Sequence, residues 1–465
     1  MLLLCIKINT ILSKKPTYNE LFQKVIELTS IVEDLIKENA FLRDRLSYFE
    51  NPKNSNNSSI PPSKDENRPL RNQSLREKTG KKVGGQPGHP GTTLTMQLEP
   101  DEVFDLIPAY CNCCGEDLTN VEQEILEKRQ VIDIPIIKSI TKEYRLYQKK
   151  CKCGHIAQSK FPEQVNSSVQ YGTNSEAMIS YLHSRQYLSF NRIEECLNDI
   201  FGLKISEGGV HNLLQRFTLK ANPVYQEIKS RIQNASSVGT DETGAKVNGK
   251  KHWYWVWQNN ALTYIAHSMN RGIDTIKYEF ANGLPNAILT HDRWSSHFHC
   301  KVKGHQLCIP HLLRDLKYLE ELYQCQWATD LKKLFLRTME FKKTLLPQDY
   351  LHPNSNRDNY EQQLIALLNF PIDNAHKKAN TLQKSLVKNR NNIFTFLYYE
   401  DVYPDNNASE RSIRNVKVKQ KISGQFKSIK GAQIYAINRS IIDTIAKSNQ
   451  NIMNGLNIIA NFTAD

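Results

Sequence analysis

With 465 residues, the chain is too long for one ordinary hydrophobic core, so we expect two to four folded units. Its 61 Lys and Arg against 48 Asp and Glu give a net charge of +13, which suits a polyanionic partner. The apolar opening from Met1 to Ile6 is too short to span a membrane and lacks the basic lead and cleavage site of a signal peptide. These features argue against a secreted or membrane protein and predict a cytoplasmic one.

The first predicted element is a helix over residues 18–50 that pairs with a second copy of itself. Apolar residues recur every seven positions, and this period lines one stripe that drives coiled-coil pairing. The stripe consists of Leu21, Val25, Leu28, Val32, Leu35, Asn39, Leu42, Leu46 and Phe49. Because a single Asn in such a stripe fixes the register, the sequence predicts a parallel homodimer. An amphipathic helix packed on its own chain is the alternative.

Residues 51–100 are predicted to form a flexible basic arm. The stretch is rich in Asn, Ser, Pro and Gly and shows no hydrophobic periodicity. Its basic residues, among them Lys81 and Lys82, outnumber its acidic ones. Such an arm can follow a DNA backbone or enter a minor groove. A solvated linker would have the same composition.

Two close cysteine pairs, Cys111 with Cys114 and Cys151 with Cys153, predict a zinc-binding unit over residues 101–165. Four thiolates can converge tetrahedrally on one structural Zn²⁺, which would hold shape and perform no chemistry. The one-residue gap of the second pair leaves the ligand set open, so Cys113 or His155 can replace one member. Buried free cysteines are the alternative.

Residues 170–222 have a helical period that breaks at Gly202–Ser206. Ser206 can cap the following helix, so the layout is helix, short turn, helix. This layout is typical of a helix-turn-helix DNA-binding region, although helical hairpins are common in proteins without that role.

Residues 235–311 change to the alternation of β-strands. Asn248-Gly249 predicts a tight hairpin between the first two strands. We expect strands over 238–247, 253–257, 262–266, 287–292 and 307–309, with a short helix near 274–280. Three antiparallel strands, a helix and a further strand is the order of an RNase H-like α/β fold, here a mixed five-stranded sheet with helices.

Three acids are the candidate catalytic residues. In that strand order the first and fourth strands lie side by side, so Asp241 in the first would meet Asp292 at the end of the fourth. Glu410 lies in a later helix, one turn before Ile413, on what we expect to be its apolar face. Shared carboxylates of this kind can hold two Mg²⁺ or Mn²⁺ ions about 4 Å apart. Taken singly, a strand-end cap for Asp241 and a surface pair with Arg414 for Glu410 are the plainer alternatives.

The remaining chain completes this fold. Residues 312–400 are mostly helical and predict an insertion into the catalytic core, which resumes over 401–450 and ends in a C-terminal tail, 451–465. Between the two parts, His297, Cys300 and Cys308 stand among several His residues. A second zinc site there is disfavoured, because cysteine is ordinary in a buried strand, and His311 is expected to begin the next helix near the active site.

Several motifs together resemble the insertion-sequence 66 family of transposases over nearly the whole chain. They are the Asn57–Ser63 stretch, Gly84–Gly91, the cysteine pairs, Asp241–Gly244, Asn248–Lys250, His252-Trp253, His291–Trp294, Cys308 with His311 and Arg314, and Asn406–Arg411 with Arg414. Two departures are the gap between Cys151 and Cys153 and Ser409, where a small apolar residue is more usual. By this resemblance Asp241, Asp292 and Glu410 correspond to the acidic triad of a DDE-type enzyme.

The resemblance also implies an activity. A bacterial transposase would bind the terminal inverted repeats of its insertion sequence, hydrolyse the phosphodiester at the element's end, and join the freed 3′-hydroxyl to target DNA. Mg²⁺ would serve both steps, and accessory proteins of the same element are possible partners. Basic residues after the third acid are expected to hold DNA phosphates, namely Arg411, Arg414, Lys417, Lys419 and Lys421. A catalytically inactive DNA-binding regulator and a purely hydrolytic nuclease are the alternatives.

Overall fold

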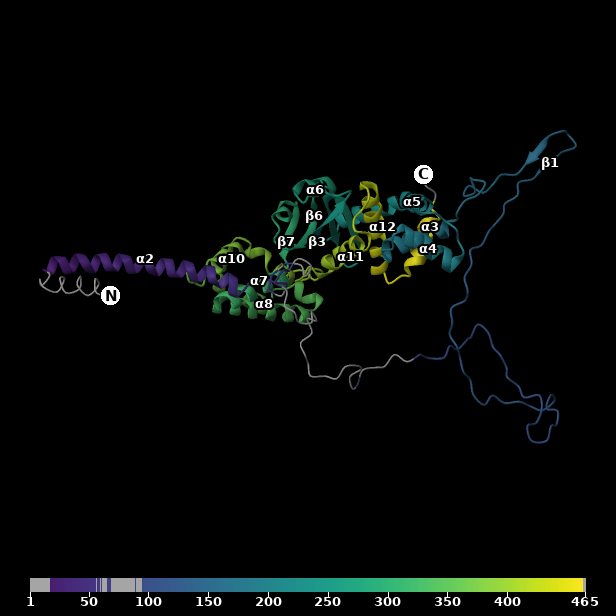
Figure 1. The fold of residues 1–465 in the computed structure, drawn as a ribbon, viewed down its shortest axis with the longest axis horizontal. Coiled ribbons are helices and arrows are strands. Elements are labelled where there is room, and N and C mark those ends of the chain that lie inside the picture. Colours follow the sequence, from purple (N-terminus) through teal and green to yellow (C-terminus); the bar gives the residue numbers. More distant parts are fainter. Residues whose placement is uncertain are drawn as a thin grey trace, which may run out of the picture.

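A computed structural model of the chain describes residues 17–55, 57–58, 60, 65–67, 88 and 94–462. Figure 1 shows one long helix, α2, projecting from one end of a globular body, while long extended segments leave the other end. Lys81 and Lys82 lie outside the described residues. Within the described part of the chain, no helix is both long and apolar enough to cross a membrane.

The body is built on a mixed five-stranded sheet with the strand order β5-β4-β3-β6-β7. Its strands are β3 (Ser237–Val247), β4 (Lys250–Gln258), β5 (Thr263–Ser268), β6 (Leu284–His291) and β7 (Val302–Leu307). The first three are antiparallel neighbours, whereas β6 runs parallel to β3 and β7 runs parallel to β6. Asn248 and Gly249 both have positive φ, at 46° and 75°, as a tight hairpin turn requires. The expected pairing of the first and fourth strands is therefore confirmed.

Alternation along β4 supplies a core to each face of the sheet. Trp255 and Trp257 are at most 1% exposed and pack with Phe217 of a helix before the sheet. Tyr254 and Val256 point to the other face, where they pack with Tyr435 of a helix after it. Because side chains of a strand point alternately to opposite faces, a fully apolar stretch of β4 is buried on both sides.

Some helices of the body precede the strands in the sequence, some lie between them, and the others follow them. They are α3 (Thr173–Ser180), η2 (Tyr181–Arg185), α4 (Phe190–Phe201), α5 (Glu207–Gln233), α6 (Ile273–Glu279), η3 (Ser295–His299), α11 (Asn407–Ser423), α12 (Ile429–Lys447) and α13 (Ile452–Ala460). Helix α12 packs on β5 and α5, α11 on β3 and β4, and α13 on α3. Residues 451–465, expected as a tail, thus contain a helix with Leu456 and Ala460 fully buried.

The helical insertion has a core of its own. Its elements are α7 (Ile309–Tyr323), α8 (Gln326–Thr344), η4 (Pro347–Tyr350), α9 (Ser355–Leu368), α10 (Lys377–Lys388), η5 (Arg390–Asn392) and η6 (Thr395–Leu397). Buried Leu331, Phe335 and Phe394 pack there with Ile288 and Leu307 of the sheet. The predicted strand over 307–309 is wrong in its bounds: the fifth strand ends at Leu307, Cys308 is the N-cap of α7, and Pro310 opens that helix.

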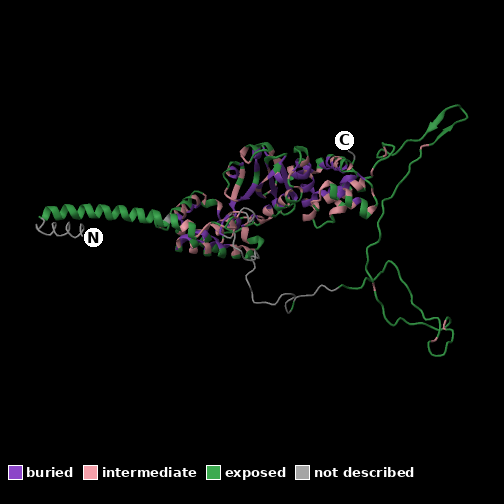
Figure 2. Cartoon of the chain, viewed as in Figure 1, coloured by how far each residue is buried: buried purple, intermediate pink, exposed green. Residues whose placement is uncertain are grey.

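Helix α2 (Tyr18–Glu50) has the predicted bounds. It begins with a capping box, in which Thr17 accepts from the Glu20 backbone N–H and Glu20 bonds back to Thr17. Its apolar stripe faces solvent for its whole length, which Figure 2 shows as an exposed helix. The predicted pairing with a second copy stays a prediction.

Residues 94–172, which we call the thiol segment, contain little regular structure. Its only strands are β1 (Gln148–Lys150) and β2 (Ile156–Gln158), an antiparallel hairpin that Figure 1 places at the tip of one extended arm. Apolar side chains along the segment are exposed, among them Leu98, Leu106, Leu126 and Val131, each above 90%. Figure 2 shows the segment as exposed almost throughout.

Candidate active site at the junction of β3 and β6

Asp241 and Asp292 are brought together by two parallel strands. In the register of β3 with β6, Gly239 lies opposite Thr290. Asp241 stands two residues beyond Gly239, and Asp292 two residues beyond Thr290, just past the end of β6. The two carboxylates therefore leave adjacent strands at the same level of the sheet, as the sequence predicts.

Glu410 reaches the same place from the first turn of α11. The side chain of Asn406 donates from Nδ2 to the Thr240 carbonyl oxygen at 2.7 Å, which ties the start of α11 to β3. Gly239 permits this approach, since a Cβ there would lie 2.8 Å from atoms of Asn406 and Ser409. Asn406 is the N-cap residue of α11, but its side chain bonds β3 and makes no cap hydrogen bond to its own helix.

The three acids influence one another electrostatically. Burial raises the pKa of Asp241 well above its usual value, and the negative charges of Glu242, Asp292 and Glu410 raise it further. One hydrogen bond, from the Glu242 backbone N–H to Asp241 Oδ1 at 2.8 Å, works against this shift. An ionised Asp241 is therefore costly here unless a cation accompanies it.

The Glu410 side chain is 18% exposed and lies among basic residues. Its Oε1 is 3.9 Å from Arg314 Nη2 and 3.7 Å from His311 Nε2, both on α7. Burial and the charge of Arg314 lower the pKa of His311, while Glu410 opposes this. Arg414 Nη2 lies 3.5 Å from Glu410 Oε2, so the surface pair considered from the sequence also forms. Oε1 of Glu410 is nonetheless buried without a hydrogen-bond partner among the described residues.

A buried side-chain network that the sequence did not reveal supports Asp292. Glu242 accepts from Arg271 Nε at 2.8 Å and lies 3.1 Å from His297 Nε2, which is itself 3.8 Å from Asp292 Oδ1. Burial alone would raise the pKa of Glu242, but the hydrogen bonds and charges of His297 and Arg271 hold it below its usual value. The side chains of Glu242 and His297 are at most 1% exposed, so the network is a fixed part of the fold.

The backbone after Asp292 is held in an uncommon conformation. Arg293 has φ of 49°, in the left-handed region that a residue with a side chain rarely adopts. Its guanidinium pairs with Asp315 of α7. The next residue, Trp294, donates its backbone N–H to Asp292 Oδ1 at 3.0 Å, and its ring stacks 3.8 Å from the Arg271 guanidinium carbon. The turn and its neighbours thus fix the direction of the Asp292 carboxylate.

Asp241, Asp292 and Glu410 have the chemistry to bind a divalent cation, although their side chains are not arranged as a complete metal site. Carboxylate oxygens are the ligands that Mg²⁺ and Mn²⁺ prefer. The unpartnered Glu410 oxygen and the raised pKa of Asp241 are both features that a bound cation would relieve. Among the residues that the structure describes, no three His, Cys, Asp or Glu side chains are arranged as a metal site.

The predicted zinc ligands form two separate turns. The backbone carbonyl oxygen of Cys111 accepts from the Gly115 N–H at 2.9 Å, and that of Cys151 accepts from the Gly154 N–H at 2.9 Å. Backbone N–H groups of Cys114 and Cys113 lower the pKa of the Cys111 thiol, and that of Cys153 lowers the pKa of Cys151. Both turns therefore favour thiolate, although within the described range the two pairs do not gather at one point.

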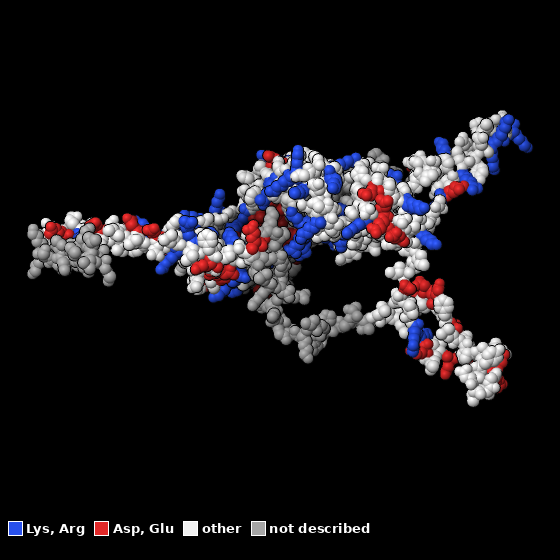
Figure 3. Space-filling model, viewed as in Figure 1, with Lys and Arg blue, Asp and Glu red and all other residues white. Residues whose placement is uncertain are grey.

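The expected phosphate ligands on α11 divide into two groups. Arg411, Arg414 and Lys421 are exposed, as a DNA contact requires. Lys417 is half-buried and donates to the Gly244 carbonyl oxygen, which braces α11 against β3. Lys419 is buried and donates to the Leu188 carbonyl oxygen at 2.8 Å. Figure 3 shows many further Lys and Arg side chains over the visible face of the body.

The predicted helix, turn and second helix form α4 and α5, whereas a DNA-binding role for them stays a prediction. Gly202 ends α4 with φ of 61°, and Ser206 caps α5 by accepting from the Gly209 N–H at 3.2 Å. Helix α5 extends to Gln233, beyond the predicted region, because its later residues pack against the sheet and α12. Cys300 and Cys308 are buried, as expected for ordinary core cysteines.

The sheet and site define the class of protein: a mixed α/β protein with one acidic residue on β3 and another just past the end of the adjacent parallel strand β6. The chain matches the model of the transposase IS66 family over residues 168–434, more than half of its length, and it belongs to this family. Residues 13–95 match the model of a family of unknown function. A comparison with curated proteins found no match.

Proposed function

We propose that the protein is a DDE-type DNA transposase with an RNase H-like core, which cuts at the ends of its insertion sequence and joins them to target DNA. The observation that carries this proposal is the placement of Asp241 and Asp292 on adjacent parallel strands, with Glu410 delivered to them by α11. Membership of a transposase family supports the same activity.

Asp241, Asp292 and Glu410 would hold Mg²⁺ or Mn²⁺, which supplies Lewis-acid activation of the phosphodiester and of the attacking water or 3′-hydroxyl. The chain's own residues orient the acids. Glu242 bonds His297, which lies 3.8 Å from Asp292 Oδ1 on the buried side. The Asn406 side chain ties the start of α11 to β3 and so sets the position of Glu410. Arg314, 3.9 Å from Glu410, is placed to attract a phosphate oxygen to the site.

Other parts of the chain would bind DNA and assemble the protein. The proposed DNA contacts are Arg411, Arg414 and Lys421 on α11, the basic arm with Lys81 and Lys82, and the α4–α5 helix pair, which would read the terminal repeats. Structural Zn²⁺ at Cys111, Cys114, Cys151 and Cys153 would fold the thiol segment. Helix α2 would form a homodimer. The protein would act in the bacterial cytoplasm, with accessory proteins of its element as possible partners.

Strand cleavage tests the proposal directly. A duplex carrying the element's own terminal repeat is incubated with Mg²⁺ and either the wild-type chain, Asp241→Asn, or the matched exposed variant Asp358→Asn. We expect cleavage at the element's edge, followed by strand transfer, for the wild type and Asp358→Asn only. Tight DNA binding without cleavage would favour the regulator, and cleavage without joined products would favour a hydrolytic nuclease.

A further inference from the structure

Helix α2 has an apolar stripe that its own chain leaves uncovered. Leu21, Leu28, Leu35 and Leu42 are 52–56% exposed, and the alternating positions Val25 and Val32 are 59% and 50% exposed. An isolated helix of this kind loses stability in water unless a second apolar surface covers the stripe. The stripe repeats every seven residues, so the surface that matches it best is another helix with the same repeat.

The C-terminal part of α2 lies against the helical insertion. Lys377 and Lys378 of α10 sit over the rings of Phe41 and Tyr48, with the Lys378 ammonium 3.6 Å from the Tyr48 ring centre. Just after the helix, Asn57 donates from Nδ2 to Glu321 of α7 at 2.6 Å. These contacts fix the position of α2 relative to α7 and α10.

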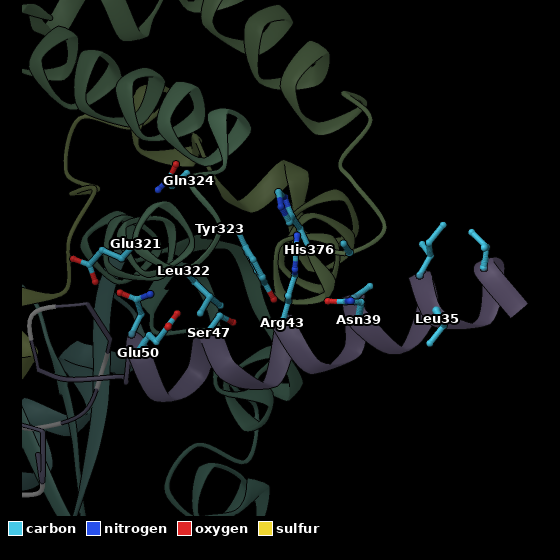
Figure 4. Close-up of a pocket in the computed structure, with 15 residues that line it drawn as sticks. Leu35, Asn39, Arg43, Ser47, Glu50, Glu321, Leu322, Tyr323, Gln324 and His376 are labelled. Atoms are coloured by element: carbon cyan, nitrogen blue, oxygen red, sulfur yellow. The ribbon is translucent and has the colours of Figure 1, made fainter. Parts of the chain in front are cut away.

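An open groove of about 810 Å³ remains between α2 and the helical insertion. One wall is α2, with Val32, Leu35 and Asn39; the other is formed by Tyr323 and Gln324 at the end of α7 and by His376 before α10. Figure 4 shows the Arg43 side chain of α2 extending toward Tyr323 and His376 of the insertion, with Asn39 and Leu35 farther along the helix.

We propose that this groove receives helix α2 of a second copy of the chain. The seven-residue stripe and the groove wall share three residues, Val32, Leu35 and Asn39. A partner helix that pairs along the stripe therefore enters the groove with its C-terminal part. The occupant then touches two surfaces: α2 of its partner and the end of that partner's helical insertion. The dimer is itself part of the proposed function, and this inference states where the two copies meet.

The contact has a route to the candidate active site. Helix α7 carries the groove wall at Tyr323 and, on its first turns, His311 and Arg314 beside Glu410. A helix of 15 residues transmits a displacement as one rigid element. A displacement of α7 at the groove would therefore move His311 and Arg314 relative to Glu410.

Site-specific photo-crosslinking of the full chain tests the groove. A benzophenone amino acid replaces Ala375, an exposed groove residue, and Asn359 is replaced as an exposed control outside the groove. We expect a covalent dimer from position 375, with the adduct mapping to residues 32–46 of the other copy, and none from position 359. A dimer in sedimentation that gives only monomer-mass adducts from position 375 would overturn the proposal, as would a monomeric chain.

A groove-filling variant gives a second measurement. Ala375→Trp occupies the groove without altering the α2 stripe, and Asn374→Trp places the same ring just outside it. Because the partner helix would have to shift around the ring, we expect the dimer dissociation constant to rise about tenfold for Ala375→Trp only. Equal constants for the two variants would contradict the proposal. Cleavage of the terminal-repeat duplex is scored separately, so a crosslinked but inactive chain would count against the proposed activity alone.

Discussion

Apolar residues are buried in the body but exposed in the thiol segment. In the body, Trp255 and Trp257 are buried between helices and the sheet. In the thiol segment, Leu98, Leu106, Leu126 and Val131 are each more than 90% exposed. Only the body has long strands that pair with their neighbours in sequence and present two apolar faces.

Because of this difference in burial, the acidic site of the body and the cysteine site of the thiol segment must form in different ways. The body brings Asp241 and Asp292 together by backbone pairing alone. The thiol segment has a single three-residue strand pair and two cysteine turns that lie apart. Exposed apolar surface of this extent is unfavourable in water, and the structural zinc proposed for the segment would draw its two cysteine turns together.

The largest expected effect separates the two regions by zinc. Addition of Zn²⁺ should protect the thiol segment from protease, since zinc binding in small sites contributes about 10–16 kcal/mol to folding. Cys153→Ser should abolish this protection and leave the body resistant, whereas Cys196→Ser in α4 should behave as the wild type. Limited proteolysis with mass spectrometry measures this, and equal protection in Cys153→Ser would exclude Cys153 as a ligand.

The next effect is confined to the body. Glu410→Gln keeps the shape of the side chain and removes its charge, so we expect cleavage to fall roughly a thousandfold or more, about 4 kcal/mol of transition-state stabilisation. The thermal midpoint should change little, because Glu410 is only partly buried and makes no buried hydrogen bond through Oε1. Calorimetry and cleavage rates are compared with Glu340→Gln, an exposed glutamate in α8. Full activity in Glu410→Gln would remove it from the catalytic set.

A smaller effect is expected at His297, which positions Asp292. His297→Gln should weaken Mn²⁺ binding about 10–100-fold, the usual cost of losing a group that orients a metal ligand. The exposed neighbour His299→Gln, in the same short helix, is the matched control. Titration of the Mn²⁺ electron paramagnetic resonance signal reads this without reference to activity, and unchanged affinity in His297→Gln would show that His297 only fills space.

Gly239 tests how tightly α11 is seated on β3. Gly239→Ala places a methyl group 2.8 Å from side-chain atoms of Asn406, Gln258 and Ser409. We expect a loss of about 1–3 kcal/mol of unfolding free energy and lower cleavage, because the start of α11 must move. Gly208→Ala, where the nearest atom is 3.8 Å away, should be neutral or slightly stabilising. Urea unfolding distinguishes the two.

The smallest effect concerns Asp241 and pH. Burial and the neighbouring acids raise its pKa in the folded state, so the folded chain holds this proton more tightly than the unfolded chain. Stability is therefore lost as pH rises above the unfolded pKa of about 4. Asp241→Asn has no charge to form, so with chelator present it should melt a few degrees above the wild type at pH 8. The difference should vanish near pH 4, and a lower melting temperature at pH 8 would contradict the argument.

Much of the body was predictable because its signals are local. The Asn248-Gly249 turn and the alternation along β4 fix the hairpin, and the apolar run before Asp292 fixes β6. Both central acids follow from these strands.

Features that depend on distant contacts were not predictable in this way. The Glu242–His297 contact joins residues 55 positions apart, and no periodicity indicates it. Lys417 has the basic side chain expected of a phosphate ligand, but it donates a hydrogen bond to the Gly244 carbonyl oxygen. Two errors had a local signal that could have prevented them: Pro310 favours a helix start after Leu307, and the apolar run over residues 452–460 favours a helix in place of a tail.

The left-handed backbone at Arg293 gives the molecule a mechanical property. This conformation costs on the order of 1 kcal/mol for a residue with a side chain, and the ion pair with Asp315 of α7 opposes its relaxation. The direction of the Asp292 side chain thus depends on a strained turn that an ion pair ties to the helical insertion. Asp315→Asn removes the charge that pairs with the Arg293 guanidinium, so the direction of the Asp292 carboxylate should be less firmly fixed.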